Sequence, residues 1–249
     1  MANFTAGLEK LSFHHEDLVP VKSIKTKYGD ILFTMYGETT EFRVRTLFTK
    51  EPETIAWIDT FKPGEVFWDI GANIGCYSLY AAKKKDLVVQ AFEPSPANFW
   101  LIVRNTAINK FDKMTCYPFA LSASSGIYFW EPHISAGSAD NQLLKKGKAA
   151  CTQAYRIDEL VKYPSVEFPN HIKLDVDGIE RLILEGSGDT LKDKRVLSLM
   201  CEVNENDSQE TRGIVEFLSA QGFSLPVTRH PPHFDQNHYA PWFNYLFIK

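Results

Sequence analysis

The sequence lacks a paired cysteine motif, a long apolar run and a basic tract. Its four cysteines are scattered without a Cys-x-x-Cys pair, which argues against a zinc knuckle or a dithiol redox motif. No segment approaches the ~18 uninterrupted apolar residues of a membrane span, and residues 1–10 have no apolar core before their first charges. We therefore expect a cytoplasmic protein without a membrane span, with reduced thiols at Cys76, Cys116, Cys151 and Cys201.

Charge is nearly balanced, with 27 basic and 31 acidic residues and a formal net charge of −4. The nearest basic clusters, 83–85 and 145–146, are short and are typical of solvated helix ends or loops. Because nucleic-acid affinity depends on many phosphate contacts from Lys and Arg, we expect no nucleic-acid partner. Nothing in the composition indicates an oligomeric state.

The first 62 residues are predicted to form an extension packed on the main domain, residues 63–249. Residues 31–36 and 42–45 have the composition of short strands and flank turn residues, which predicts a β-hairpin. A helix is expected to begin at Pro52, a residue suited to a first helical turn, and to stop at residues 62–64.

From Val66 the sequence alternates short apolar runs with segments of helical periodicity, which predicts a parallel sheet. The expected fold is α/β, with a doubly wound, mostly parallel sheet. Residues 122–165 are instead expected to be mostly loop. Expected strands are 66–68, 87–92, 114–121, 171–175 and 196–201, with a closing pair at 223–227 and 243–248, and expected helices are 74–83, 97–109 and 179–185.

The segment 69–75, DIGANIG, stands where the first parallel strand should end and a helix begin. A dinucleotide fingerprint would need glycine at Asn73 and Cys76, so the spacing is G-x-x-x-G instead of G-x-G-x-x-G. This longer loop does not suit a pyrophosphate, and the carboxylate of Asp69 suits a cationic or amino-bearing ligand. Glu93 ends the second strand 22 residues after Gly71, where its carboxylate can accept both hydroxyls of a ribose. The two signals together predict a nucleoside-containing cofactor.

Several separated stretches resemble the FkbM family of S-adenosylmethionine-dependent methyltransferases, known mainly for methylating hydroxyl groups of sugars and polyketides. They lie between residues 50 and 205 and agree with the family in their order, their spacing and the residues they contain. The resemblance implies a class I, Rossmann-like methyltransferase fold and S-adenosylmethionine as cofactor. It also implies O-methylation of a sugar, a glycan or a related natural product. The stretches are 51–54 (EPET), 66–78 (VFWDIGANIGCYS), 92–95 (FEPS) with Asn98 and Asn105, 156–160 (RIDEL) and 172–180 (IKLDVDGIE).

Carried over residue by residue, the resemblance places the glycine loop beside the amino-acid part of the cofactor, Glu93 at the ribose, and Asn98 with residues 120–122 near the nucleoside. The cofactor-binding residues so implied are Asp69, Gly71, Asn73, Gly75, Ser78, Glu93, Asn98 and Ser122.

Asp175 and Asp177 follow a predicted strand at the edge where open α/β sheets bind ligands. Methyl transfer to oxygen requires the acceptor hydroxyl to lose a proton, so both are candidate catalytic residues, with Asp175 the first candidate for the base. The alternative is that Asp175 binds the cofactor's amino group or a loop amide and that Asp177 caps the next helix.

Other chemistries stay open at this point. Asp175 with Glu202 and Asn204 offers oxygen ligands for magnesium, but carboxylates at this edge of a sheet are common without a metal. Three histidines near the C-terminus (His230, His233, His238) invite a zinc interpretation, but prolines interrupt their spacing. No metal is therefore predicted. His133 is an alternative base. A cofactor-binding module without catalysis and a nucleotide-dependent oxidoreductase are the competing functions, the latter disfavoured by the missing phosphate loop.

Overall fold

The computed structural model describes residues 19–130, 137, 150–176, 178–224 and 241–249. Asp177, His133 and the three C-terminal histidines, which the sequence singled out, lie outside the described residues, as does most of the strand expected at 223–227. The rest of the expected closing pair is present, because β11 (Trp242–Ile248) is a strand and Ser224 forms an isolated bridge with Ile248.

The chain begins, within the described part, with an antiparallel hairpin of β1 (Val21–Ile24) and β2 (Ile31–Thr34). The prediction of a strand at 42–45 is wrong, because these residues belong to helix α2 (Glu38–Arg45). Thr40 and Val44, four residues apart, are buried on one face of that helix, whereas Phe42 is 37% exposed. The alternation of apolar and basic residues at 42–45 therefore reflects a partly exposed helix and not a pleated strand.

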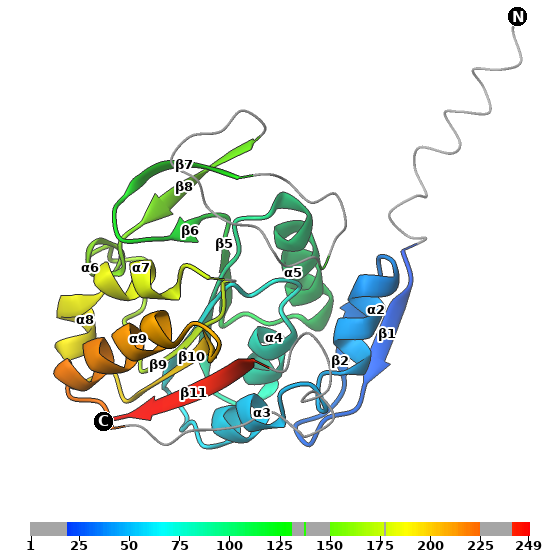
Figure 1. The fold of residues 1–249 in the computed structure, drawn as a ribbon. Coiled ribbons are helices and arrows are strands. Elements are labelled where there is room, and N and C mark those ends of the chain that lie inside the picture. The colour runs from blue at the N-terminus through cyan, green and yellow to red at the C-terminus, as the bar shows by residue number, and fades with distance from the viewer. Residues whose placement is uncertain (1–18, 131–136, 138–149, 177, 225–240) are drawn as a thin grey trace, which may run out of the picture.

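The central sheet has six strands in the order β11-β10-β9-β3-β4-β5, and every pair is parallel except that of β10 with β11 (Figure 1). This confirms the doubly wound α/β fold. The strands besides β11 are β3 (Val66–Ile70), β4 (Val88–Phe92), β5 (Met114–Tyr117), β9 (His171–Leu174) and β10 (Ser198–Asn204).

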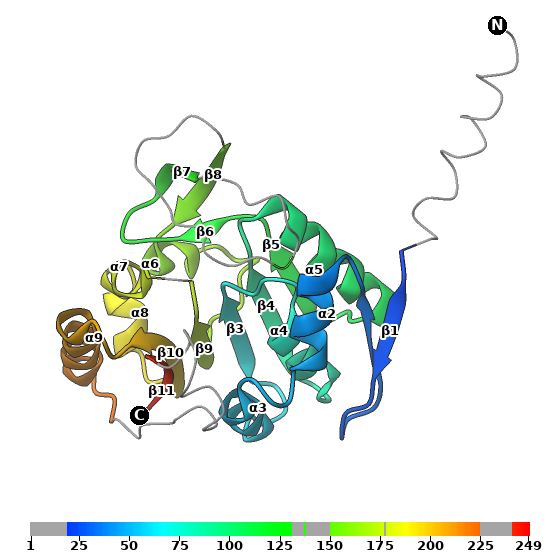
Figure 2. The same cartoon turned by 45° about the vertical axis from the view of Figure 1, so that its right-hand side comes forward.

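Helices cover both faces of this sheet (Figures 1 and 2). The hairpin, α2 and the first three helices of the core lie over one face, and the later helices cover the other, each side with its own hydrophobic cluster. The first group is α3 (Pro52–Asp59), α4 (Cys76–Lys83) and α5 (Pro96–Asn109), and the second is α6 (Ile157–Leu160), α7 (Glu180–Glu185), α8 (Gly188–Lys192) and α9 (Ser208–Ala220).

Two asparagines of α5 hold the N-terminal hairpin against the core. The backbone N–H of Leu32 donates to Asn109 Oδ1 at 2.8 Å, and that of Thr34 donates to Asn105 Oδ1 at 2.7 Å. These bonds satisfy the outer edge of β2, which would otherwise present unpaired donors. The boundary between extension and main domain at residue 62 stays a prediction.

A second, three-stranded sheet of order β6-β8-β7 follows β5, formed by β6 (Ala120–Leu121), β7 (Gly126–Trp130) and β8 (Ala150–Tyr155). The expectation that residues 122–165 are mostly loop is therefore wrong for β7, β8 and α6. The single strand expected at 114–121 is also divided, because β5 pairs with β4 and β6 pairs with β8.

The order of the strands fixes where a ligand can bind. From β3 the chain proceeds to β4 on one side, whereas β9 flanks β3 on the other, so the connections diverge between β3 and β9. Open α/β sheets bind ligands at the carboxyl ends of strands at such a divergence. Asp69, near the end of β3, and Asp175, directly after β9, lie at this point.

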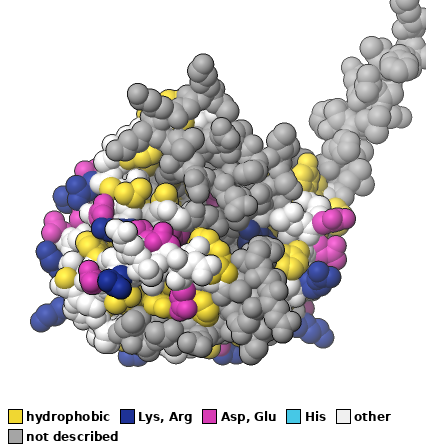
Figure 3. Space-filling view, viewed as in Figure 1, with side chains coloured by type: hydrophobic (Ala, Val, Ile, Leu, Met, Phe, Trp, Pro, Cys, Tyr) yellow, Lys and Arg dark blue, Asp and Glu magenta, His cyan; other side chains and the backbone are white. Residues whose placement is uncertain are grey.

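No helix of the described residues is long and apolar enough to cross a bilayer. On the face shown in Figure 3, basic and acidic side chains of the described residues are intermixed.

Candidate active site

The loop after β3 lies directly against the residue that follows β9. Gly71 has φ +84°, and a Cβ at this position would be 1.8 Å from the carbonyl oxygen of Asp175. Its N–H donates to Phe92 O at 3.0 Å, so the ends of β3, β4 and β9 converge at Gly71. Only glycine combines this conformation with this contact. Gly75, with φ +87°, lies against a side chain of α5 instead, because a Cβ there would be 2.6 Å from Ile102 Cγ1.

Glu93 connects this loop to the end of β4. Its Oε2 accepts the backbone N–H of Asn73 at 2.8 Å and its Oε1 accepts that of Ser95 at 2.8 Å. Burial raises the pKa of Glu93 to about 7, against hydrogen bonds from Ser95, Asn73 and Asn98 that lower it. These three bonds leave one of the roughly four lone-pair sites of the carboxylate for a further hydroxyl donor. Asn98 in turn accepts the N–H of Gly137 at 2.7 Å.

Asp69 is 1% exposed and faces α4. Burial raises its pKa, while Lys173 and the hydrogen bond donated by Ser78 Oγ lower it. Ser78 is fully buried, so it supports the Asp69 carboxylate from behind.

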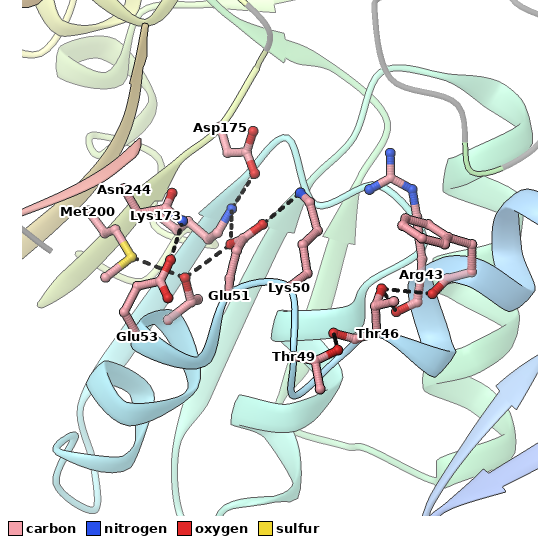
Figure 4. A network of polar contacts seen from close by, with 12 residues as sticks. Arg43, Thr46, Thr49, Lys50, Glu51, Glu53, Lys173, Asp175, Met200 and Asn244 are labelled. Carbon is pink, nitrogen blue, oxygen red and sulfur yellow. Dashed lines mark hydrogen bonds and ion pairs between the residues drawn. The ribbon is translucent and has the colours of Figure 1, made fainter. Parts of the chain in front are cut away.

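A network of buried charges joins α3 to β9 (Figure 4). The Lys173 ammonium, 2% exposed, lies 2.5 Å from Asp175 Oδ2 and 3.8 Å from Glu51 Oε2. Glu51 Oε1 pairs with Lys50 Nζ at 2.8 Å, and Glu51 Oε2 accepts the Thr54 hydroxyl at 3.0 Å. The charges alternate in sign along this chain of contacts, which offsets much of the cost of their burial.

The pKa values in this network follow from the pairing. Burial raises the pKa of Glu51, but Lys50 and Lys173 overcome this and lower it to about 2. The Glu51 carboxylate raises the pKa of Lys50 above its usual value. Burial lowers the pKa of Lys173, but Asp175, Glu51 and Asp69 overcome it, so the net shift is upward. All three groups are therefore charged at neutral pH.

Two hollows meet at Gly71. The charged hollow encloses about 440 Å³ and the apolar hollow about 320 Å³, each partly open to solvent. The charged hollow is lined by Arg43, Thr46, Lys50, Glu51, Asp69, Gly71, Ala72, Asn73, Ile74, Cys76, Tyr77, Lys173 and Asp175. The apolar hollow is lined by Ile70, Gly71, Phe92, Pro94, Phe119, Ala120, Leu121, Val176 and Ile179.

With this geometry established, comparison with known proteins gives a clear result. The methyltransferase FkbM domain matches residues 69–225, more than half of the chain. The chain belongs to the FkbM methyltransferase family. The resemblance noted in the sequence is thereby confirmed, and the chain is a methyltransferase.

Two curated proteins show the range of this FkbM-family chain's relatives. The hexuronic acid methyltransferase AglP of Haloferax volcanii is 27% identical over 201 residues, covering 79% of each chain. The 31-O-demethyl-FK506 methyltransferase FkbM of Streptomyces tacrolimicus is 24% identical, covering 85% of this chain and 92% of its own length.

Solved structures support the fold. The FkbM methyltransferase of Methylobacillus flagellatus has a TM-score of 0.54 at 18% identity, and the match covers 76% of this chain but only 44% of that one. A precorrin-6y C5,15-methyltransferase of Geobacter metallireducens has a TM-score of 0.51 at 14% identity, covering 80% and 87% of the two chains. The class I methyltransferase fold is thereby confirmed.

The residues singled out from the sequence occupy different parts of the FkbM-family site. Asp69, Gly71, Asn73 and Asp175 line the charged hollow. Other members lie around it: Glu93 and Asn98 are buried at the end of β4 and in α5, Ser78 lies behind Asp69, and Gly75 begins α4. Ser122 is 3% exposed and lines neither hollow, although Ala120 and Leu121 before it line the apolar one. All eight cofactor assignments stay predictions.

The magnesium alternative is not assembled by the described side chains. Asn204 Oδ1 accepts the N–H of Asn206 at 3.0 Å, which directs it toward its own loop. Within the described ranges, no group of three or more His, Cys, Asp or Glu side chains is arranged to hold a metal ion.

Sequence reasoning missed several residues of the charged hollow, above all Arg43, Lys50, Glu51 and Lys173. One signal was present, because a lysine inside the buried strand β9 needs a partner. Its partner Glu51 lies 3.8 Å away across the fold, and only the tertiary structure reveals that pairing.

Proposed function

We propose that this FkbM-family chain transfers the methyl group of S-adenosylmethionine to a hydroxyl of a sugar, a glycan or a related natural product. The observation that carries the proposal is the buried Glu93 carboxylate, bound to the Asn73 N–H opposite the Gly71 loop, with one hollow on each side of that glycine. This arrangement suits a ligand with a ribose in the middle and two chemically different ends.

The residues present fit the parts of S-adenosylmethionine. The apolar hollow, lined by Phe92, Phe119 and Leu121, suits the adenine ring, and the remaining lone pair of Glu93 suits a ribose hydroxyl. In the charged hollow, Asp69 suits the amino group, and Arg43 with Lys50 suits the carboxylate. When bound, S-adenosylmethionine supplies an electrophilic methyl group on its sulfonium.

The choice of acceptor rests on two relatives. One is named for a hexuronic acid and the other for a 31-O-demethyl compound, and both names are compatible with an oxygen-rich small molecule as acceptor. Asp175 lines the charged hollow directly after β9, at the carboxyl edge of the sheet. Asp175 and Asp177 stay the predicted catalytic residues. The alternative for Asp175 is a contact with the cofactor's amino group or a loop amide, and the alternative for Asp177 is a helix cap.

Calorimetric titration of the purified chain with S-adenosylmethionine, and separately with NAD, tests the cofactor assignment. We expect S-adenosylmethionine to bind and NAD not to bind. Glu93→Ala removes the proposed charged hydrogen bond to the ribose and should weaken S-adenosylmethionine binding by roughly 10- to 100-fold. Glu216→Ala, at an exposed position of α9, is the matched control and should bind normally.

Turnover to S-adenosylhomocysteine with hexuronic acids, neutral hexoses or other polyols then tests the acceptor class. Binding of NAD in place of S-adenosylmethionine would end the methyltransferase proposal for this site. Binding without turnover on any acceptor would favour the binding-module alternative. The absence of a nucleic-acid partner and a cytoplasmic location remain predictions.

A further inference from the structure

Glu202, a residue outside both hollows, stands next to Asp175 at the carboxyl edge of the sheet. Lys173 is in register with Asp69 on one side and with Met200 on the other. Cys201 then pairs with Leu174, so Glu202 is the next residue of β10 and Asp175 is the first residue after β9. Because side chains alternate between faces, Glu202 and Asp175 lie on the same face as Lys173 and Met200, one row closer to the edge.

The two neighbouring carboxylates have different surroundings. Asp175 Oδ2 receives the Lys173 ammonium at 2.5 Å. Glu202 is half-buried, and its carboxylate has no hydrogen-bond or ion-pair partner within the part of the chain that the structure describes. One carboxylate is thus held by a fixed cation, and the other can exchange a proton with a ligand.

The electrostatics support the same division. Burial and the adjacent Asp175 raise the pKa of Glu202 well above that of an ordinary glutamate. Glu51 raises it further, while Lys50 and Lys173 lower it. A carboxyl group at the edge of a binding site whose pKa is raised by burial and by a neighbouring charge is a general signature of an acid–base role.

We propose that Glu202 accepts the proton of the acceptor hydroxyl during methyl transfer, and that Asp175 with Lys173 positions the groups around it. This assignment rests on the proposed O-methyltransferase function. As the acceptor oxygen forms its bond to the methyl carbon, the carbon–sulfur bond breaks with its electron pair on sulfur, and the hydroxyl proton passes to a Glu202 carboxylate oxygen. Glu202 becomes a neutral acid and then releases the proton to water.

The first test needs no acceptor. In protein labelled with ¹³C at glutamate Cδ, the resonance lost in Glu202→Gln identifies Glu202, and its chemical shift is followed against pH. We expect a midpoint well above the ordinary glutamate value of 4.5. A midpoint at or below that value would overturn the proposal, whatever the acceptor.

The second test uses turnover with whichever polyol acceptor the screen identifies. Glu202→Gln should lower kcat by roughly 10²- to 10⁴-fold and abolish the acidic limb of its pH profile, while the Kd for S-adenosylmethionine changes less than about twofold. Asp175→Asn should lower kcat but keep the acidic limb, since it removes a positioning contact. Glu216→Gln, the same chemical change at an exposed position of α9, should behave as wild type.

Three outcomes would overturn the assignment of Glu202 while leaving the methyltransferase proposal intact. The acidic limb could vanish in Asp175→Asn instead. Activity could disappear with EDTA and return with Mg²⁺, which would make the carboxylates metal ligands. Full activity of Glu202→Gln on a hydroxyl acceptor would show that Glu202 does not accept its proton. Failure of the wild-type protein to bind S-adenosylmethionine, in contrast, would overturn the proposed methyltransferase function itself.

Discussion

The two hollows on either side of Gly71 differ in almost every physical respect. The charged hollow has three basic and three acidic side chains along its wall, most of them paired, whereas the apolar hollow is lined by aliphatic and aromatic side chains and backbone. The first can fix a ligand by directed, charged hydrogen bonds, and the second by excluding water from a flat apolar surface. A single glycine separates the two environments, so one ligand can use both.

The largest effect is expected from Gly71→Ala, which acts on both hollows. The new Cβ would lie 1.8 Å from the Asp175 carbonyl oxygen, so β3 and β9 must separate. We expect complete loss of S-adenosylmethionine binding in calorimetry and a loss of roughly 3 kcal/mol or more in unfolding free energy. Gly64→Ala is the control, because Gly64 also has a positive φ, +86°, but an added Cβ there would have nothing within 4 Å. It should cost only about 1–2 kcal/mol and keep binding. Equal losses in the two variants would show that the strain of a positive φ, and not the contact with the Asp175 carbonyl, causes the loss of stability.

Glu51→Gln tests whether the charged hollow is stabilised by its ion pairs. The pKa of Glu51 falls from 4.5 to about 2 on folding, so its carboxylate stabilises the native state above pH 4.5, and this contribution is lost as pH falls toward 2. The shift corresponds to about 3 kcal/mol at neutral pH. Urea unfolding at pH 7 should show that loss in the variant, and the difference from wild type should narrow below pH 4.5. A constant difference across this range would argue against the ion pairs as its source. Glu216→Gln serves as the exposed control.

Arg43→Gln separates the two hollows. Arg43 lines the charged hollow, and its Nε donates to Gly137 O at 2.5 Å. If its outer nitrogens bind the cofactor carboxylate, S-adenosylmethionine should bind about tenfold more weakly, a cost of about 1.4 kcal/mol. Binding of 5′-methylthioadenosine, which lacks the amino-acid part, should be unchanged. Arg45→Gln, exposed on the same helix, should affect neither ligand. Equal weakening of both ligands would place the carboxylate elsewhere.

Phe119→Leu gives the smallest expected effect and acts on the apolar hollow. The Phe119 ring packs against Tyr155 with ring centroids 4.7 Å apart, at the wall where adenine is proposed to lie. Losing this aromatic surface should weaken 5′-methylthioadenosine and S-adenosylmethionine by the same factor, roughly three- to tenfold. Phe48→Leu, outside both hollows, is the control. An effect on S-adenosylmethionine alone would contradict the placement of adenine.

The regular core was predictable because its signals are local. The core strands β3, β4, β9 and β10 are short, mostly apolar runs, and the glycine loop and Glu93 stand at strand ends that the pattern itself locates. Prediction failed where the local signal is ambiguous. Residues 42–45 alternate in polarity as a strand does, but they belong to a helix, and Val44 is the buried residue among them.

The charged hollow was less predictable because it depends on distant pairs. Asp69 and Asp175 were found from their place at strand ends. The pairing of Lys173 with Glu51, and the row that brings Glu202 beside Asp175, depends on strand order and register, which residue composition does not specify.

The contact between Gly71 and the Asp175 carbonyl also limits how this site can change. Because the two strand ends already touch through backbone atoms, the distance between the cofactor loop and the carboxylate edge cannot be adjusted by one residue at a time. New acceptor preferences must therefore arise from side chains around the site and not from the spacing of the two strand ends.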